Sequence, residues 1–161
     1  YNNDISKVLV SVNTLDLKNC QEKEIKRNEI EFFYRGTNLP KELIITSVKL
    51  KGQLKSKNDI EKKQNELIER KKISQPNQIK TCGSTFKNFS NKKKAWELIK
   101  ETGCHKFKEG DAMISEKHCN FFINNGKAKS SDIEKLINKV KKTVSDKAGV
   151  NLELEIKIVG E

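Results

Sequence analysis

The most informative stretch of this sequence is Thr81-Cys82-Gly83-Ser84-Thr85-Phe86-Lys87-Asn88. It is a turn of small residues that presents the hydroxyl of Ser84 beside a lysine and an asparagine. Gly83 permits backbone torsions that a Cβ would forbid, so we expect a ligand or cofactor to approach the neighbouring serine closely. Two further polar clusters follow, SEKHCNF at 115–121 and LELEI at 152–156. Together the three segments predict one functional site.

The chain has 161 residues and a formal net charge of +11. This length corresponds to about one domain, or to one small domain and part of another. Only three of the 33 cationic residues are arginines, namely Arg27, Arg35 and Arg70. A composition rich in lysine, asparagine and isoleucine is what an AT-rich coding sequence gives, so we favour a charge spread over solvated faces. The alternative is an anionic partner, such as a phosphate ligand or nucleic acid.

The cysteine pattern indicates free thiols in a reducing cytoplasm, because there is no C-x-x-C pair and no secretory signal. The four cysteines are Cys20, Cys82, Cys104 and Cys119. Cys104 and Cys119 each adjoin a histidine, and cysteine and histidine side chains are the usual ligands of a zinc site. Adjacent residues on a strand point to opposite faces, so we expect no metal site. No apolar run approaches the roughly 20 residues that span a bilayer.

The first part of the chain predicts strands and one charged helix. Alternation of apolar and polar residues predicts strands over Val8–Leu17 and Leu43–Lys51, with Val8, Val10 and Val12 on one face of the first. A short return strand is expected near Ile25 and a helical turn over Asn28–Glu31. The strongly charged segment Asn58–Lys72 predicts a surface helix. Gln75-Pro76 ends that helix and marks the domain boundary, between 1–74 and 75–161.

The second part predicts a compact α+β unit with two capped helices. Lys94–Thr102 is amphipathic and is followed by Gly103 as a C-terminal cap. A capping box at 131–134 opens a helix that ends near Ala148, with Gly149 as its cap. The other expected elements are a loop over Phe107–Gly110, strands over Ala112–Ile114, Cys119–Ile123 and Asn151–Val159, and a turn over Asn124–Gly126.

Each candidate residue also has a structural interpretation. The two glutamates of 152–156 are typical of a solvated strand edge, and Ser84 of a turn. His118 is ordinarily a satisfied structural histidine, and Trp96 is ordinarily a core residue. Arg35 is either a lone ion-pair partner or a bidentate clamp on a carboxylate or phosphate, a role in which lysine is a poor substitute.

The order and spacing of the motifs favour the functional interpretation. The sequence resembles the latter half of the UDP-N-acetylenolpyruvoylglucosamine reductases (MurB), the flavoenzymes that complete UDP-N-acetylmuramate for peptidoglycan. The blocks that carry the resemblance are Tyr34-Arg35, Gln75-Pro76, Gly83–Asn88, Ser115–Phe121, Asn124–Gly126, Asp132-Ile133 and Gly149–Gly160. It implies the C-terminal part of an FAD-binding (PCMH-type) α+β domain over 1–74. A small α+β substrate-binding domain is implied over 75–161.

The resemblance also implies a reaction in two halves. NADPH reduces bound FAD, and a hydride then passes to the enol ether of the UDP-sugar substrate, which leaves an enolate that must be protonated. Ser84 is the implied proton donor, with Arg35 and Glu155 stabilising the enolate and the carboxylate. The implied binding residues are Asn88, His118, Tyr34 and Lys87 for substrate, and Gly83 for cofactor.

Further expectations follow from the resemblance. They are a cytoplasmic monomer that binds neither nucleic acid nor a membrane, and a chain that begins at Tyr1 as a fragment without most of the flavin cradle. Three positions depart from the family pattern, Cys82, Phe89 and Asp111, and Asp111 is expected to bring a negative charge near an anionic substrate. The competing hypotheses are a basic, non-enzymatic module for nucleic acid or another anionic polymer, and a flavin-dependent oxidase with a changed substrate.

Overall fold

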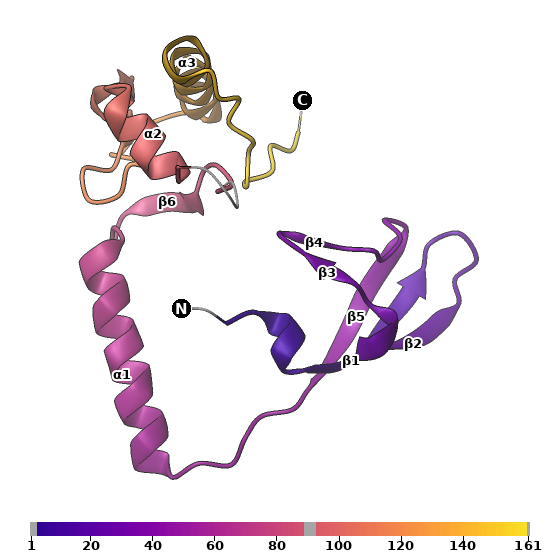
Figure 1. Cartoon of the computed structure of the whole chain (residues 1–161). Helices are drawn as coiled ribbons and strands as arrows, with labels where there is room; N and C mark the ends of the chain where they lie inside the picture. Colours follow the sequence, from indigo (N-terminus) through magenta and orange to yellow (C-terminus); the bar gives the residue numbers. More distant parts are fainter. Residues whose placement is uncertain (1–2, 89–92, 161) are drawn as a thin grey trace. The chain divides into compact units, whose positions relative to one another are not determined.

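The computed structural model describes residues 3–88 and 93–160. The chain divides into two compact units, Tyr1–Asp59 and Ile60–Glu161, and each is described by itself (Figure 1). Both combine sheet with helical segments, which confirms the predicted α+β class.

The first unit is built on a three-stranded antiparallel sheet in the order β2-β1-β5. Its strands are β1 (Leu9–Asp16), β2 (Glu22–Lys26) and β5 (Leu43–Leu50), which confirms the predicted strands. A small hairpin of β3 (Phe32–Phe33) and β4 (Gly36–Thr37) completes the unit. Two 3-10 turns, η1 (Ile5–Lys7) and η2 (Arg27–Glu29), flank these strands, and η2 confirms the predicted helical turn.

The predicted alternation along the first strand is only partly right. Val10 is exposed whereas both Ser11 and Val12 are buried. The pairing of β1 with β5 shifts between Leu9 and Ser11, so β1 has one extra residue there. Such a bulge interrupts the period of two, and the sequence pattern alone does not locate it.

The core face of β5 is only partly covered within the described residues. Val48 pairs with buried Val12, and Leu50 with Leu9, so these side chains share the face of the small core. Both nevertheless remain more than half exposed, and Val8, which directly precedes β1, is 39% exposed. The first unit therefore presents an unusually apolar sheet face.

We expect the 161-residue chain to bind a hydrophobic dye at this face. Val48→Lys should reduce the fluorescence gained by 8-anilinonaphthalene sulfonate, because it places a charge within the apolar surface. Ile73→Lys is the matched control, because Ile73 is exposed on a helix of the other unit. Equal losses in the two variants, or no dye binding by the wild type, would contradict this assignment.

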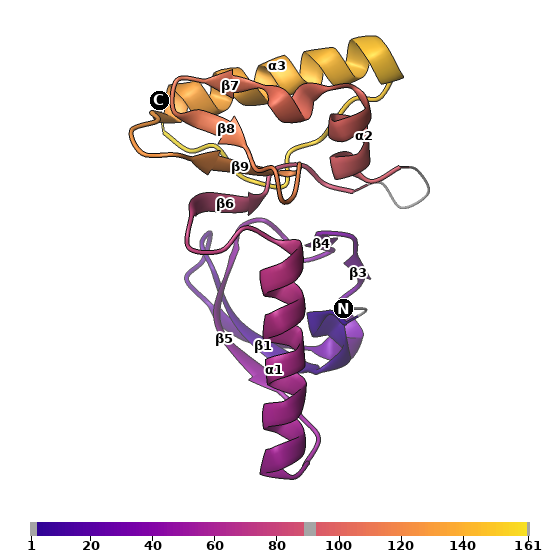
Figure 2. The same cartoon turned by 90° about the vertical axis from the view of Figure 1, so that its left-hand side faces the viewer.

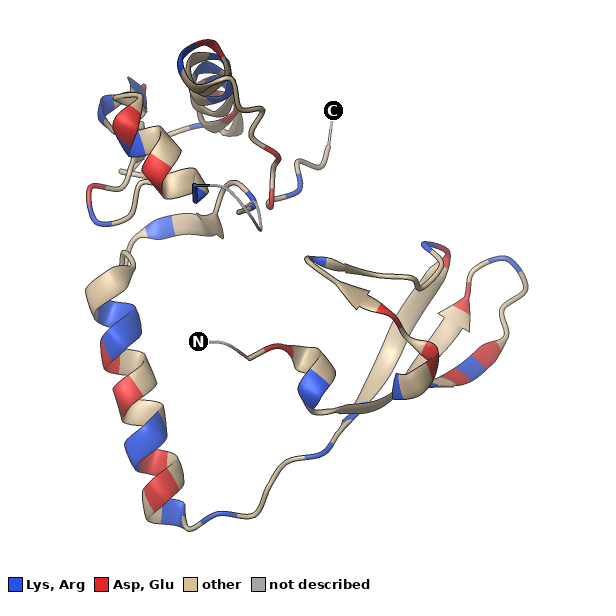
Figure 3. Cartoon of the chain, in the orientation of Figure 1, with Lys and Arg blue, Asp and Glu red and all other residues tan. Residues whose placement is uncertain are grey.

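The charged helix α1 (Lys57–Ser74) confirms the predicted surface helix. None of its residues is buried. Ion pairs at i,i+3 spacing join Lys63 to Glu66 and Glu69 to Lys72. Figure 3 shows acidic and basic residues alternating along it rather than forming a single-sign band.

The second unit is a four-stranded antiparallel sheet in the order β6-β9-β8-β7, with helices packed against it. The strands are β6 (Lys80–Ser84), β7 (Lys108–Glu109), β8 (Ala112–Ile114) and β9 (Phe121–Asn124). Helix α3 (Ser130–Ala148) runs along β7 and β8, and α2 (Ala95–Glu101) packs beside it (Figure 2). The 3-10 turn η3 (Cys104–Lys106) follows α2.

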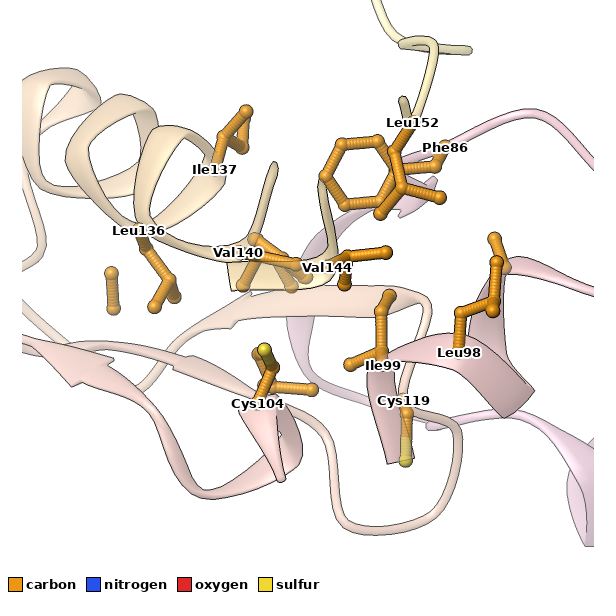
Figure 4. Packing of buried hydrophobic residues seen from close by; sticks show 14 residues of the cluster. Phe86, Leu98, Ile99, Cys104, Cys119, Leu136, Ile137, Val140, Val144 and Leu152 are labelled. Atoms are coloured by element: carbon orange, nitrogen blue, oxygen red, sulfur yellow. The ribbon is translucent and has the colours of Figure 1, made fainter. Parts of the chain in front are cut away.

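The helices follow from their sequence signals. Gly103 and Gly149 both adopt positive φ after α2 and α3, as the predicted caps require. At the start of α3 the carboxylate of Asp132 accepts a hydrogen bond from the backbone N–H of Lys129, so the helix begins slightly before the predicted capping box. The core of this unit, shown in Figure 4, includes Phe86, Leu98, Ile99, Leu136, Ile137, Val140, Val144 and Leu152.

Three predicted elements differ from the structure. Thr81–Ser84, expected as the start of a turn of small residues, belongs to strand β6, because it pairs with β9. Lys108–Glu109 is a short strand rather than part of a loop, because it pairs with β8. The segment Asn151–Val159 is extended but is not a regular strand. It makes a single isolated bridge, between Phe86 and Leu154. The alternating leucines and isoleucines predicted a ladder, but a ladder also needs a continuous neighbouring strand.

The packing of α3 gives a stability prediction. Leu136 is completely buried, so Leu136→Ala should lower the free energy of unfolding by about 2–5 kcal/mol, through lost burial and a residual cavity. Asn138→Ala is the control, because Asn138 is exposed on the same helix. Chemical denaturation measures both changes, and a cost below about 1 kcal/mol for the leucine would contradict the packing.

Candidate active site

Ser84 is placed by a bulge in β6. Thr81 pairs with Ile123 and Ser84 with Phe121, so three steps along β6 match two steps along β9. The extra residue falls at Cys82-Gly83, where Gly83 has φ +87°. Bulges re-aim the side chains that follow them and are frequent beside active sites. The required positive φ explains the glycine and confirms the predicted torsional role of Gly83.

The residues after Ser84 are held from both sides. The N–H of Thr85 donates to the carbonyl of Asn120 at 2.8 Å, and the carbonyl of Thr85 accepts the N–H of Glu155 at 2.9 Å. Lys87 N–H donates to the carbonyl of Glu153 at 2.8 Å. Thus Ser84 and Glu155, 71 positions apart in sequence (155 − 84), are connected through the single residue Thr85.

The two glutamates of the C-terminal segment have different environments. Glu153 is exposed and its carboxylate lies 3.5 Å from Nζ of Lys87, an ion pair at the surface. Such a pair contributes little to stability. Glu155 is half-buried and its Oε2 is inaccessible to solvent. The solvated-edge interpretation therefore fits Glu153 and does not fit Glu155.

Asn88 lies where the 85–88 segment approaches helix α2. Its side-chain oxygen accepts the backbone N–H of Ala95, the first residue of α2, at 3.1 Å. This places Asn88 on the same segment as Ser84 and Lys87, so three predicted site residues are brought together with Glu155. Phe89, one of the departures from the family pattern, lies outside the described residues.

His118 lines a pocket of about 300 Å³ together with Trp96, Lys100 and Lys117, and none of residues 84–88 borders this pocket. Its ring packs edge-on against Phe121 at 4.7 Å between centroids, and against Trp96 at 6.5 Å. Nδ1 of His118 accepts the backbone N–H of Asn120 at 3.3 Å. Because Nδ1 is the acceptor, the neutral ring carries its proton on Nε2, where it can donate to a ligand.

Burial lowers the pKa of His118 below its usual value of 6.5, because desolvation penalises the imidazolium. Burial likewise raises the pKa of the Cys119 thiol. The histidine is therefore neutral at neutral pH. It can donate a hydrogen bond from Nε2 without bringing a charge.

We expect acid to destabilise the protein partly through His118. Its folded pKa lies below the unfolded value, so the stability that the neutral ring contributes is present above about pH 6.5 and is lost as the pH falls through the folded value. The melting temperature should therefore fall more steeply between about pH 8 and about pH 5 in the wild type than in His118→Gln. Parallel pH curves for the two proteins would count against this linkage.

Tyr34 and Arg35 belong to the first unit, where they form the two-residue turn of the β3–β4 hairpin. Arg35 has φ +60°, and its guanidinium lies 4.9 Å from the centre of the Tyr34 ring. A left-handed conformation at a residue other than glycine costs roughly 1–2 kcal/mol and is frequent at functional sites. The hairpin borders a pocket of about 720 Å³ formed with residues 3–6. Convergence of Arg35 with Ser84 and Glu155 stays a prediction.

Asp111 lies at the opposite end of the second sheet from Ser84. Its carbonyl accepts the N–H of Asn125 at 2.9 Å and its carboxylate accepts the N–H of Lys127 at 2.9 Å. These bonds close the turn after β9, whereas Ser84 pairs with Phe121 at the beginning of β9. Asp111 therefore lies away from Ser84 along β9, and the expected placement of its charge near the substrate stays a prediction. Cys82, the remaining departure, is an exposed residue of the bulge.

Asn120 was not singled out by the sequence analysis. Its side chain is almost completely buried, and its carboxamide makes two hydrogen bonds to the backbone of Phe86. The available signal was an amide-bearing residue within the otherwise apolar strand pattern around 119–123. Buried polar groups of this kind are hydrogen-bonded, and they specify one arrangement of the chain.

Within the described residues, no three His, Cys, Asp or Glu side chains are arranged to hold a metal ion. Nor is any helix in 3–88 and 93–160 long and apolar enough to cross a membrane.

Comparison with known proteins agrees with this architecture. Residues 75–159 match the C-terminal domain of the UDP-N-acetylenolpyruvoylglucosamine reductases. The reductase of that name from Pelagibacter ubique is 44% identical over 99% of this chain and 53% of its own length. The one from Wolbachia pipientis wMel is 42% identical over 99% of this chain and 54% of its own length.

Solved structures give the same result. The crystal structure of the UDP-N-acetylenolpyruvylglucosamine reductase (MurB) from Thermus caldophilus superposes with a TM-score of 0.79 at 32% identity. The match covers 94% of this chain and 53% of that one. The fold and these comparisons together define an α+β protein related to a class of reductases. The chain belongs to the UDP-N-acetylenolpyruvoylglucosamine reductase family, as the resemblance indicated, and it spans about half the length of these relatives.

Proposed function

We propose that this chain is the C-terminal part of an enzyme that reduces UDP-N-acetylglucosamine enolpyruvate to UDP-N-acetylmuramate in peptidoglycan precursor synthesis. The observation that carries the proposal is the connection of Ser84 to Glu155 through Thr85, on a segment that also holds Lys87 and Asn88. In this proposal residues 1–74 complete an FAD-binding domain and residues 75–161 bind the substrate. The whole protein is a cytoplasmic monomer.

The position of Gly83 fits an FAD ring beside Ser84. A Cβ built at Gly83 would meet no atom within 4 Å, so the backbone there is open to close approach by a flat group. Gly83 would border the cofactor, which NADPH reduces. When bound, FAD supplies the hydride that adds to the methylene carbon of the enolpyruvyl group.

Ser84 is the proton donor in this proposal. Hydride addition leaves negative charge on the substrate carbon next to the carboxylate, and the serine hydroxyl gives that carbon its proton. A serine is a weak acid in water, so the site must exclude solvent and hold the hydroxyl at a fixed position. The half-buried position of Ser84, directly before two fully buried residues, supports both requirements.

Glu155 and Arg35 act on the charge that develops in the substrate. Glu155 is fixed through its backbone N–H to Thr85, and its partly buried carboxyl group faces a region of reduced solvent access. The guanidinium of Arg35 offers two parallel donors, which suit the substrate carboxylate better than a lysine would. The strained turn that carries Arg35 supports a functional role for this residue.

The remaining predicted residues bind the substrate. Nε2–H of His118 donates a hydrogen bond from the pocket that it lines. Lys87 provides a positive charge for the diphosphate, in exchange for its weak surface pair with Glu153. Tyr34, exposed at the tip of its hairpin, and Asn88 provide further contacts to the nucleotide sugar.

The nucleic-acid module is not favoured. Figure 3 shows acidic residues interspersed with the lysines over both units, where such a module would need a basic band. Of the phenylalanines that the structure describes, Phe86, Phe121 and Phe122 are buried and cannot stack on bases, whereas Phe33 is exposed on the short β3–β4 hairpin.

The test is Ser84→Ala in the complete protein that contains this chain. NADPH should still bleach the flavin, because Ser84 acts only on the substrate, while formation of UDP-N-acetylmuramate falls on the order of 10²–10⁴-fold. Ser131→Ala, an exposed serine on α3, is the matched control and should retain full turnover. Normal product formation by Ser84→Ala, or a complete protein that is colourless, would refute the proposal.

A further inference from the structure

The side-chain carboxamide of Asn120 makes the backbone hydrogen bonds of Phe86 that a neighbouring strand would otherwise make. Its Oδ1 accepts the N–H of Phe86 at 3.0 Å, and its Nδ2 donates to the carbonyl of the same residue at 2.8 Å. This is the pair of bonds that a neighbouring antiparallel strand would provide. Asn120 itself is 1% exposed, and Phe86 is completely buried.

The backbone of Asn120 reaches two other parts of the site. Its carbonyl accepts the N–H of Thr85 at 2.8 Å, and its N–H donates to Nδ1 of His118 at 3.3 Å. The carbonyl of Thr85 in turn accepts the N–H of Glu155. Asn120 is therefore hydrogen-bonded to His118 and to Thr85 and Phe86, the two residues that follow Ser84. Through Thr85 it is also connected to Glu155.

The bulge leaves the backbone groups of Phe86 without a partner in β9, and the carboxamide of Asn120 provides one. After the register shift at Gly83, β6 ends at Ser84, and the ladder of backbone bonds to β9 ends with it. The next peptide groups enter the core, where an unpaired N–H or C=O costs roughly 1–3 kcal/mol. A side-chain amide carries both a donor and an acceptor, so a single asparagine satisfies both groups of Phe86.

We propose that Asn120 is a positioning residue for Ser84 and Glu155. The proposal rests on the proposed function, in which those two side chains act on the substrate. Asn120 touches neither the substrate nor the cofactor. It fixes the 85–87 segment, whose displacement would move the serine hydroxyl and the glutamate together.

The first test is Asn120→Leu in the complete protein. Leucine has the same number of side-chain heavy atoms and the same branching but makes neither bond, so the segment loosens while the core stays filled. We expect kcat for substrate reduction to fall on the order of 10–100-fold. Bleaching of the flavin by NADPH should stay within about twofold, because that half-reaction does not use Ser84. Hydrogen exchange measured by mass spectrometry should accelerate in the peptide that contains 85–87.

The second test uses Asn120→Asp, which keeps the shape of the side chain. The carboxyl group it introduces has no donor when ionised, and has an O–H donor for the Phe86 carbonyl when protonated. Burial raises the pKa of such a carboxyl group, so kcat relative to the wild type should recover several-fold as the pH falls from about 8 to about 6. Dividing by the wild-type profile removes the titration of the groups nearby, which are His118, Cys119, Lys87, Glu153 and Glu155.

Thr102→Val is the control for a merely structural effect. Thr102 is also buried, and its hydroxyl donates to the carbonyl of Leu98 at 2.7 Å, so the variant loses a buried hydrogen bond at the C-terminal end of α2. It should lower the melting temperature without changing kcat. If soluble Asn120→Leu keeps kcat within about twofold of the wild type, or shows unchanged exchange at 85–87, the positioning role is overturned. If Ser84→Ala itself proves fully active, the proposed function fails, and the exchange measurement alone still decides whether Asn120 orders the segment.

Discussion

The segment 85–87 is the constraint on which the second unit depends. Its peptide groups are bonded on one side to Asn120 and on the other to Glu153 and Glu155. Its central side chain, Phe86, is buried and packs edge-to-face on Phe122 at 5.8 Å between ring centroids. A strand this short does not form a stable pair alone. It is stable here because burial of the phenylalanine and satisfaction of its backbone depend on the same neighbours.

This constraint explains how an accessible serine can be held rigidly. Thr85 and Phe86 are almost completely buried, whereas Ser84 immediately before them is half-buried. Because the bulge at Gly83 redirects the chain, it passes from the partly exposed Ser84 to the buried Thr85 within one residue. Buried side chains occupy single rotamers in a close-packed core. The packing of Thr85 and Phe86 therefore restrains the backbone of the adjoining Ser84.

The parts of the fold that local chemistry determines were predicted from the sequence. Helices α1, α2 and α3 have a clear period or charge pattern and recognisable ends, and the structure confirms them. The errors concern pairing between distant segments. The alternating residues of 151–159 predicted a strand, but only 85–87 is there to pair with them, and one bridge results. The bulge at Val10 likewise depends on the register against β5.

In the candidate site, too, the features set by local sequence were predicted, and those set by distant segments were not. Glycine, serine and lysine at 83–87 predicted an accessible hydroxyl in a turn. The required torsion at Gly83 is present, but it belongs to a bulged strand rather than to a turn. The contribution of Asn120 could not be predicted in the same way, because an asparagine at a strand position is usually exposed. Its partner is Phe86, 34 positions away in the sequence. Only the fold identifies the two peptide groups that need its amide.

The predicted catalytic groups are therefore constrained in two different ways. Arg35 is held by a two-residue turn whose geometry is determined by its immediate neighbours. Ser84 and Glu155 are held by bonds between segments about 35 and 70 residues apart in sequence, all of which lie against one core. Loosening that core displaces the serine and the glutamate together and leaves the hairpin intact. In the proposed function such a change would impair proton delivery by Ser84 without altering the hairpin that carries Arg35, so substrate binding and protonation need not fail together.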